Sequence, residues 1–146
     1  MHVTRIGLRD FRNYESADVD LAEGLTVVAG ANGAGKTNLL EALYFGCTGR
    51  SPRTSNEREL VRRGGEGVAR VVLDLVADDG EHRIEVGFEP GEAKHLRVDG
   101  SAVDSLSTVA VRTVRGEAAV EVGLAALRQL GSEALGIAGR RARAVA

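Results

Sequence analysis

Apolar and polar residues alternate strictly over residues 16–21, where Ala17, Val19 and Leu21 fall on one face. This period of two predicts a β-strand with one face buried. Residues 3–8 are also rich in β-forming side chains, and the turn Phe11-Arg12-Asn13-Tyr14 separates the two segments. The pattern therefore predicts two antiparallel strands near the N-terminus.

The next apolar run, residues 25–29 (LTVVA), is nearly continuous and predicts a strand covered on both faces. A helical pattern follows from Lys36, and glycines at positions 46 and 49 are expected to end that helix. Its apolar residues are expected to form one broad stripe: Leu39, Leu40, Leu43, Tyr44 and Cys47.

Further along, residues 68–77 and 81–89 flank the turn sequence Asp78-Asp79-Gly80, which is typical of a β-hairpin. A second turn at Pro90-Gly91 leads to residues 95–98, and Asp99-Gly100 turns the chain again. These spacings predict an antiparallel β-meander over about residues 66–100, appended to the preceding core. Between helix and meander, residues 49–63 read as a loop and a short helix, with Ser55 or Asn56 as its N-cap.

Between the apolar run and the helical pattern lies a glycine-rich segment that fits G-x-x-x-x-G-K-[ST], the phosphate-binding loop. Its glycines let the backbone approach a phosphate closely, and the loop N–H groups and helix N-terminus face the anion. Lys36 is expected to reach the β- and γ-phosphates, and the Thr37 hydroxyl to bind Mg²⁺. A coincidental glycine-rich turn is disfavoured, because a strand is expected before the loop and a helix after it. The predicted site consists of Gly30, Ala31, Asn32, Gly33, Ala34, Gly35, Lys36 and Thr37.

Composition narrows the setting but not the function. With 146 residues, 43% hydrophobic, 27% charged and a net charge of −2, the chain has the composition of a soluble single domain. No apolar run approaches the roughly 20 residues of a membrane span, and no signal-peptide pattern opens the chain. The single cysteine, Cys47, fits a reducing cytoplasm and extends the apolar helix row, which predicts a buried, inert thiol.

Two groups of polar residues have competing interpretations. A basic cluster after the helix could contact DNA phosphates or the nucleotide, and it could equally be a solvated face. Its members are Arg50, Arg53, Arg58, Arg62 and Arg63. The histidines, His2, His82 and His95, stand isolated on predicted strands, which argues against a metal site.

Asp74 ends the apolar run Val71-Val72-Leu73, as does the Mg²⁺-binding aspartate of many such proteins. The strand continues through Leu75 and Val76, however, and this places Asp74 in mid-strand. A magnesium aspartate is expected at the C-terminal edge of the sheet, so a structural role is favoured.

The wording of four stretches resembles the RecF family of bacterial recombination and repair proteins, which belongs with ABC-type ATPases of the SMC group. The stretches are LRDFRNY (8–14), VAGANGAGKTNLLEALY (28–44), GRSPRT (49–54) and LRVDG (96–100). The resemblance implies an α/β P-loop NTPase core, the N-terminal part of an ABC/SMC-type head, with the antiparallel β-meander as a subdomain. It also implies a cytoplasmic protein of the DNA damage and SOS response that binds ATP and Mg²⁺. The implied partners are DNA at single-strand/double-strand junctions, a second copy joined through ATP, and recombinase-loading proteins. By the same resemblance Arg12, Asn13 and Tyr14 lie near the adenine.

The resemblance covers residues 1–110, and residues 111–146 form an Ala/Gly/Arg-rich tail that does not match it. The signature motif, the Walker B aspartate and its catalytic glutamate belong to later parts of the family and are not recognisable here. We therefore expect a truncated or frameshifted version with a disordered tail, marginal stability and little ATP hydrolysis of its own.

Two other functional hypotheses remain from the residues. A small P-loop kinase would use Asp74 on Mg²⁺ and an acceptor pocket under an Arg-rich lid. A non-catalytic nucleotide-binding module would bind ATP without turnover, and unlike a RecF-like chain it would not dimerise with ATP.

Overall fold

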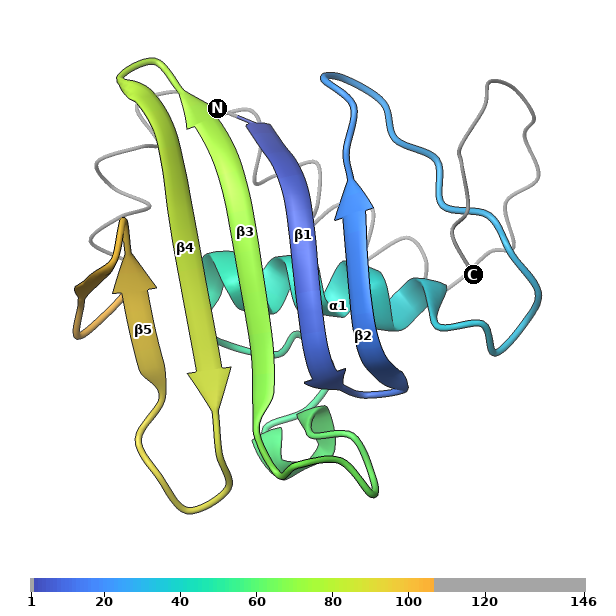
Figure 1. Cartoon of the computed structure of the whole chain (residues 1–146). Helices are drawn as coiled ribbons and strands as arrows, with labels where there is room; N and C mark the ends of the chain where they lie inside the picture. The colour runs from blue at the N-terminus through green and yellow to red at the C-terminus, as the bar shows by residue number, and fades with distance from the viewer. Residues whose placement is uncertain (1, 107–146) are drawn as a thin grey trace.

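The computed structural model describes residues 2–106, which form one six-stranded antiparallel sheet with a helix on one face (Figure 1). The strand order is β2-β1-β3-β4-β5-β6. The strands are β1 (His2–Phe11), β2 (Tyr14–Asp20), β3 (Ala69–Ala77), β4 (Gly80–Phe88), β5 (His95–Val98) and β6 (Ser101–Ala102). The two N-terminal strands and the meander are therefore confirmed.

The meander is continuous with the first hairpin and is not an appended layer. β3 pairs with β1 along its length, with Leu8 opposite Val71 and Ile6 opposite Leu73. Two-residue turns join β3 to β4 and β5 to β6, and Asp99 and Gly100 both adopt positive φ (50° and 79°), which suits a hairpin turn. Pairing between β1 and β3 thus builds one sheet from segments about 60 residues apart.

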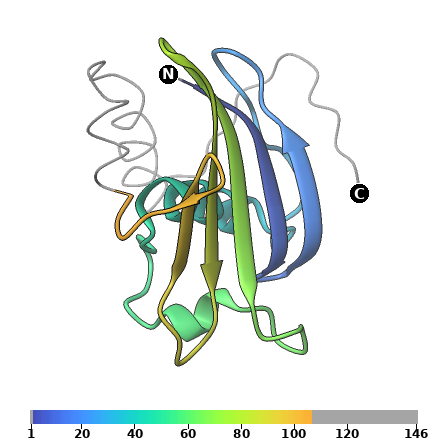
Figure 2. The same ribbon diagram turned by 60° about the vertical axis from the view of Figure 1, so that its left-hand side comes forward.

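Helix α1 (Lys36–Thr48) lies across one face of this sheet (Figures 1 and 2). It passes through Gly46 and ends at Gly49, which caps it in the left-handed conformation with φ 68°. The expectation that Gly46 helps to end the helix is wrong. The buried stripe is also rotated from the expected one, with Ala42 and Phe45 fully buried and Leu40 and Tyr44 only partly so.

The core lies between α1 and the inner face of the sheet. The inward-pointing residues of β1, β3 and β4 alternate with less buried residues, many of them polar, as expected for a sheet with one covered face. Phe11 and Phe45 meet at its centre with ring centroids 5.9 Å apart. The core residues of the three strands are Ile6, Leu8, Val71, Leu73, Leu75, Ile84, Val86 and Phe88.

The apolar run 25–29 is not a strand, contrary to the sequence-based expectation. Leu25 is 87% exposed, Val27 44% and Val28 36%, and residues 21–35 form an irregular connection from β2 to α1. A strand covered on both faces needs hydrogen-bonded neighbours, and no strand among residues 2–106 pairs with this run. The apolar pattern is present, but the backbone partners are not supplied by the described part of the chain.

The connection from α1 to β3 contains one turn of 3₁₀ helix, η1 (Glu57–Leu60), preceded by Asn56 as its N-cap. The predicted short helix is therefore confirmed, although the Asn56 side chain makes no capping hydrogen bond. The domain boundary at residues 110/111 and the tail lie outside the described residues, so these remain predictions.

Candidate nucleotide-binding site

The phosphate-loop sequence forms a tight turn between the connection and helix α1. Ala34 N–H donates to the Ala31 carbonyl at 3.2 Å, and Gly33 and Gly35 take φ values of 85° and 99°. These left-handed conformations favour glycine. The helix then begins at once, with Leu39 N–H donating to the Gly35 carbonyl at 2.9 Å.

Lys36 holds the loop closed from within. Its ammonium donates to the carbonyl oxygens of Gly30 and Ala31 at 2.7 and 2.8 Å. The neighbouring Thr37 side chain is exposed at the start of the helix. A cation, a hydroxyl and the first N–H groups of a 13-residue helix therefore meet at one exposed turn. The cation and the N–H groups suit a phosphate, and the hydroxyl oxygen suits Mg²⁺.

The F-R-N-Y turn lies directly against this loop. The Tyr14 hydroxyl donates to the Gly35 carbonyl at 3.1 Å, and Asn38 Nδ2 donates to Asn13 Oδ1 at 2.8 Å. Gly35 has φ 99°, and a Cβ there would lie 2.7 Å from Asn13 Nδ2, so the position favours glycine. Burial raises the pKa of Tyr14 and keeps its hydroxyl a proton donor. Asn13 and Tyr14 thus sit beside the loop, and a contact of either with the nucleotide base stays a prediction.

The Arg12 guanidinium is paired with a buried carboxylate, and a contact of Arg12 with the nucleotide stays a prediction. Its Nε and Nη2 donate to the two oxygens of Glu41 at 2.9 and 2.7 Å, and Glu41 has no exposed surface. Ser51 Oγ and Arg53 Nη1 donate to the same carboxylate at 2.7 and 2.9 Å. Burial opposes ionisation of Glu41, yet the hydrogen bonds from Arg12 and Ser51 and the charges of Arg12 and Arg53 outweigh it, and the pKa lies below its ordinary value. Sequence reasoning did not single out Glu41, although a glutamate among the leucines of the helix could have drawn attention to it.

Arg53 also joins this arrangement to the loop. Its Nη1 donates to Asn38 Oδ1 at 2.9 Å, and Asn38 is the residue after Thr37. The segments GRSPRT and FRNY therefore meet on the first turns of α1, as two of the four stretches that resemble RecF.

Asp74 lies in the middle of β3, and its carboxylate is occupied by arginines. Arg83 donates to it at 2.6 and 3.0 Å and Arg5 at 3.2 Å. Hydrogen bonding by Arg83 lowers the pKa of Asp74 against the opposing effect of burial, and Arg5 adds to it. Because Leu73 and Leu75 face α1, Asp74 faces away from it, on the side of the sheet opposite the phosphate loop. This arrangement supports the structural interpretation of Asp74.

The predictions for the cysteine and the histidines have different outcomes. Cys47 is partly buried and packs against the core, and burial raises the pKa of its thiol to about 11, which supports the inert interpretation. His82 is not isolated, because its ring nitrogens lie 2.8 Å from Asp99 and 3.0 Å from Asp79. No group of three metal-ligating side chains occurs within residues 2–106. Within the same range no helix is long and apolar enough to cross a membrane.

Comparison with known proteins gives the family. The sequence model described as "AAA domain" matches residues 5–137. The chain belongs to the AAA domain family. Its fold is that of a P-loop NTPase of the ABC/SMC type, in part.

Within this group the chain is similar to RecF proteins. It is 46% identical over 127 residues to the DNA replication and repair protein RecF of Roseiflexus castenholzii, covering 75% of this chain and 32% of that protein. It is 38% identical over 99 residues to RecF of Acetivibrio thermocellus, covering 68% of this chain and 27% of that protein. The chain thus spans about a third or less of these relatives, and the predicted resemblance to the RecF family is confirmed.

Solved structures agree. The recombination mediator protein RecF with ATP superimposes with a TM-score of 0.66 at 32% identity, covering 71% of this chain and 28% of that one. A structure from work on ATP-driven dimerisation and DNA-stimulated activation of SMC ATPases gives a TM-score of 0.67 at 22% identity, over 75% of each chain. The second likeness supports the fold alone.

Proposed function

We propose that this chain is an ATP-binding protein of recombinational DNA repair and replication, acting in the manner of RecF. The observation that carries the proposal is the loop Gly30–Thr37, closed by Lys36 and packed against the F-R-N-Y turn. The RecF relatives named in DNA replication and repair, and the RecF structure named with ATP, support it.

In the proposed complex the loop N–H groups and Lys36 bind the triphosphate, and Thr37 contributes one ligand to Mg²⁺. The exposed Thr37 hydroxyl next to the Lys36 ammonium fits both roles. Bound Mg²⁺ would neutralise part of the phosphate charge. Asn13 and Tyr14 are proposed to border the base, and Arg12 to position them through its bonds to Glu41.

The wider role is also part of the proposal. It includes an ATP-dependent homodimer, binding to DNA at single-strand gaps, work with recombinase-loading proteins in the SOS response, and a cytoplasmic location.

With Asp74 bound to two arginines, we propose that this chain alone binds ATP and does not turn it over. The kinase alternative loses its magnesium ligand for the same reason.

The test is titration of ATP and Mg²⁺ into the chain by calorimetry, with Lys36→Ala and the matched variant Arg58→Ala. Lys36→Ala should weaken binding about tenfold or more, because it removes charge-assisted bonds worth about 1.5–3 kcal/mol. Arg58 is exposed outside the loop, so its removal should leave the affinity unchanged. Equal affinities for wild type and Lys36→Ala would overturn the proposed site.

A second measurement separates the RecF-like role from a non-catalytic nucleotide module. Light scattering with and without ATP should show an ATP-dependent increase in mass if the role is RecF-like. A mass that stays at one chain with saturating ATP would favour the module.

A further inference from the structure

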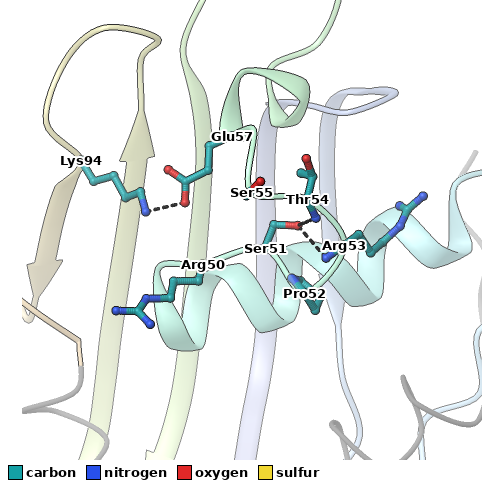
Figure 3. A pocket seen from close by; sticks show the side chains of 8 residues that line it. All are labelled: Arg50, Ser51, Pro52, Arg53, Thr54, Ser55, Glu57 and Lys94. Atoms are coloured by element: carbon teal, nitrogen blue, oxygen red, sulfur yellow. Dashed lines mark hydrogen bonds and ion pairs between the residues drawn. The ribbon is translucent and has the colours of Figure 1, made fainter.

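A polar pocket lies beside α1, separate from the phosphate loop. Its volume is about 540 Å³, and it shares no lining residue with the segment 30–37. The lining residues are Arg50, Ser51, Pro52, Arg53, Thr54, Ser55, Glu57 and Lys94 (Figure 3). The loop that follows α1 forms most of the pocket, and Lys94, the residue before β5, completes its lining.

The pocket is positive although the whole chain carries a net charge of −2. Three cationic side chains and one carboxylate line it. The carboxylate, Glu57, is neutralised by Lys94, whose Nζ lies 2.6 Å from Glu57 Oε1 and donates to the Gly49 carbonyl at 2.6 Å. Arg50 is exposed, and no carboxylate among the described residues pairs with it. The local excess of positive charge therefore rests mainly on Arg50, with Arg53 partly offset by Glu41.

The structure divides the basic cluster seen in the sequence. Arg62 is withdrawn from it, since its Nε donates to buried Asp10 at 2.6 Å. Arg58 and Arg63 do not line the pocket, whereas Lys94, distant in the sequence, does. Neither a wholly solvated face nor a single five-arginine surface describes this region.

The arrangement of polar side chains around the pocket favours an extended anion. In Figure 3 the side chains of Arg50 and Lys94 lie toward one end of the loop 51–55 and that of Arg53 toward the other. Thr54 and Ser55, between them, bring hydroxyl groups. An open pocket with a free cation, Arg50, at one end and hydroxyl groups along its loop suits a strand in which phosphates recur at regular intervals. The lining holds no aromatic ring on which a base could stack, so the contact would be with the backbone and not with bases.

We propose that this pocket binds the phosphodiester backbone of DNA, with Arg50 as its principal free cation. The proposal rests on the proposed function, because it supplies a contact surface for the DNA partner named there. It adds a site apart from the nucleotide loop and assigns it to residues that the loop does not contain.

The test measures binding of a short fluorescein-labelled DNA duplex to the 146-residue chain by anisotropy, with saturating ATP and at several salt concentrations. The variants are Arg50→Ala, Arg50→Lys and the matched control Arg58→Ala. Arg50→Ala should weaken binding severalfold and reduce the slope of log affinity against log salt by about 0.9, the loss of one phosphate contact. Arg50→Lys should retain most of the affinity, and Arg58→Ala should equal wild type.

Calorimetry with ATP on the same variants separates the two proposals. Arg50→Ala should bind ATP as wild type does, because the pocket and the loop share no residue. Unchanged DNA binding in Arg50→Ala, or no DNA binding by an ATP-binding wild type, would overturn the pocket and leave the nucleotide site standing. Loss of ATP affinity in Arg50→Ala would assign the pocket to the nucleotide and also overturn it. If wild type binds no ATP, the proposed function fails first.

Discussion

At the scale of single residues, Glu41 connects helix α1 to two segments that lie beside the phosphate loop. It is a fully buried carboxylate in the second turn of α1 that accepts from Arg12, Ser51 and Arg53. These donors come from the F-R-N-Y turn and from the loop after the helix. One carboxylate therefore joins the F-R-N-Y turn, the helix and the loop after it. Without Glu41, the N–H and O–H groups that donate to it would lose this acceptor.

Replacing Glu41 by Gln should lower the free energy of unfolding by about 3 kcal/mol, because breaking a buried ion pair leaves uncompensated charge on Arg12. Urea unfolding followed by circular dichroism measures this. Glu59→Gln is the matched control, since Glu59 also approaches Arg12, at 3.7 Å, but is 53% exposed. Its removal should cost less than about 1 kcal/mol. Equal losses for the two variants would contradict the role assigned to Glu41.

At the scale of elements, the packing of α1 on β3 depends on a missing side chain. A Cβ at Gly46 would lie 2.7 Å from Leu73 Cδ1 and 3.0 Å from Val71 Cγ1. Glycine in a helix interior is normally unfavourable, so its presence indicates that close approach to the sheet outweighs helix propensity. That approach also explains why Ala42, Phe45 and Gly46 are buried together with Leu39, whereas Leu40 and Leu43 are only partly buried.

Gly46→Ala should therefore destabilise the protein, although alanine favours helices. Overpacking costs about 1–3 kcal/mol and helix propensity returns about 1 kcal/mol, which leaves a net loss of up to about 2 kcal/mol. Gly87→Ala serves as the control, because a Cβ there would make only ordinary contacts, with His95 Cβ at 3.5 Å and the His95 carbonyl oxygen at 3.9 Å. Thermal melts of both variants decide the matter, and a melting temperature of Gly46→Ala at or above that of wild type would refute the packing argument.

At the scale of the whole molecule, ion pairs link turns and strands that are distant in sequence. His82 on β4 joins Asp79 in the β3–β4 turn to Asp99 in the β5–β6 turn. Hydrogen bonds that His82 makes to the carboxylates of Asp99 and Asp79 raise its pKa above the ordinary value of 6.5. Hydrogen bonding by His82 lowers the pKa of both aspartates below 3.8. Elsewhere the pKa of Asp10, Glu41 and Asp74 is also lowered by arginine partners.

These shifts predict maximal stability between about pH 4.5 and 6.5, the ordinary values for Glu41 and His82. The carboxylates stabilise the fold above their unfolded pKa values, and this contribution is lost as pH falls through their lower folded values. The His82 contribution is full below 6.5 and is lost as pH rises through its raised folded pKa.

Melting temperatures measured from acid to alkaline pH should show this maximum. His82→Gln should flatten the alkaline side, while His95→Gln, which lies outside the described ion pairs, should keep the wild-type profile. A wild-type melting temperature that stays constant as pH rises from 6.5 would contradict the role of His82.

Much of this protein follows from its sequence because the relevant physics is local. Strand alternation, the turn residues at Asp79-Gly80 and Asp99-Gly100, and the glycine spacing of the phosphate loop act within a few residues. The mid-strand position of Asp74 and the inert Cys47 were predictable for the same reason. The family resemblance was predictable from the residues of four short stretches.

What only the tertiary structure decided depends on partners that are distant along the chain. An apolar run becomes a strand only if another backbone pairs with it, and residues 25–29 have no such neighbour among residues 2–106. Glu41 is a structural residue because Arg12 and Ser51 meet it, and Gly46 belongs to the helix because β3 approaches it closely. Likewise Arg62 pairs with Asp10 and does not line the pocket, whereas Lys94, distant in the sequence, lies beside Arg50 in the pocket. A charge or an apolar side chain acquires its role from the groups that reach it in space, and spacing along the chain does not specify those groups.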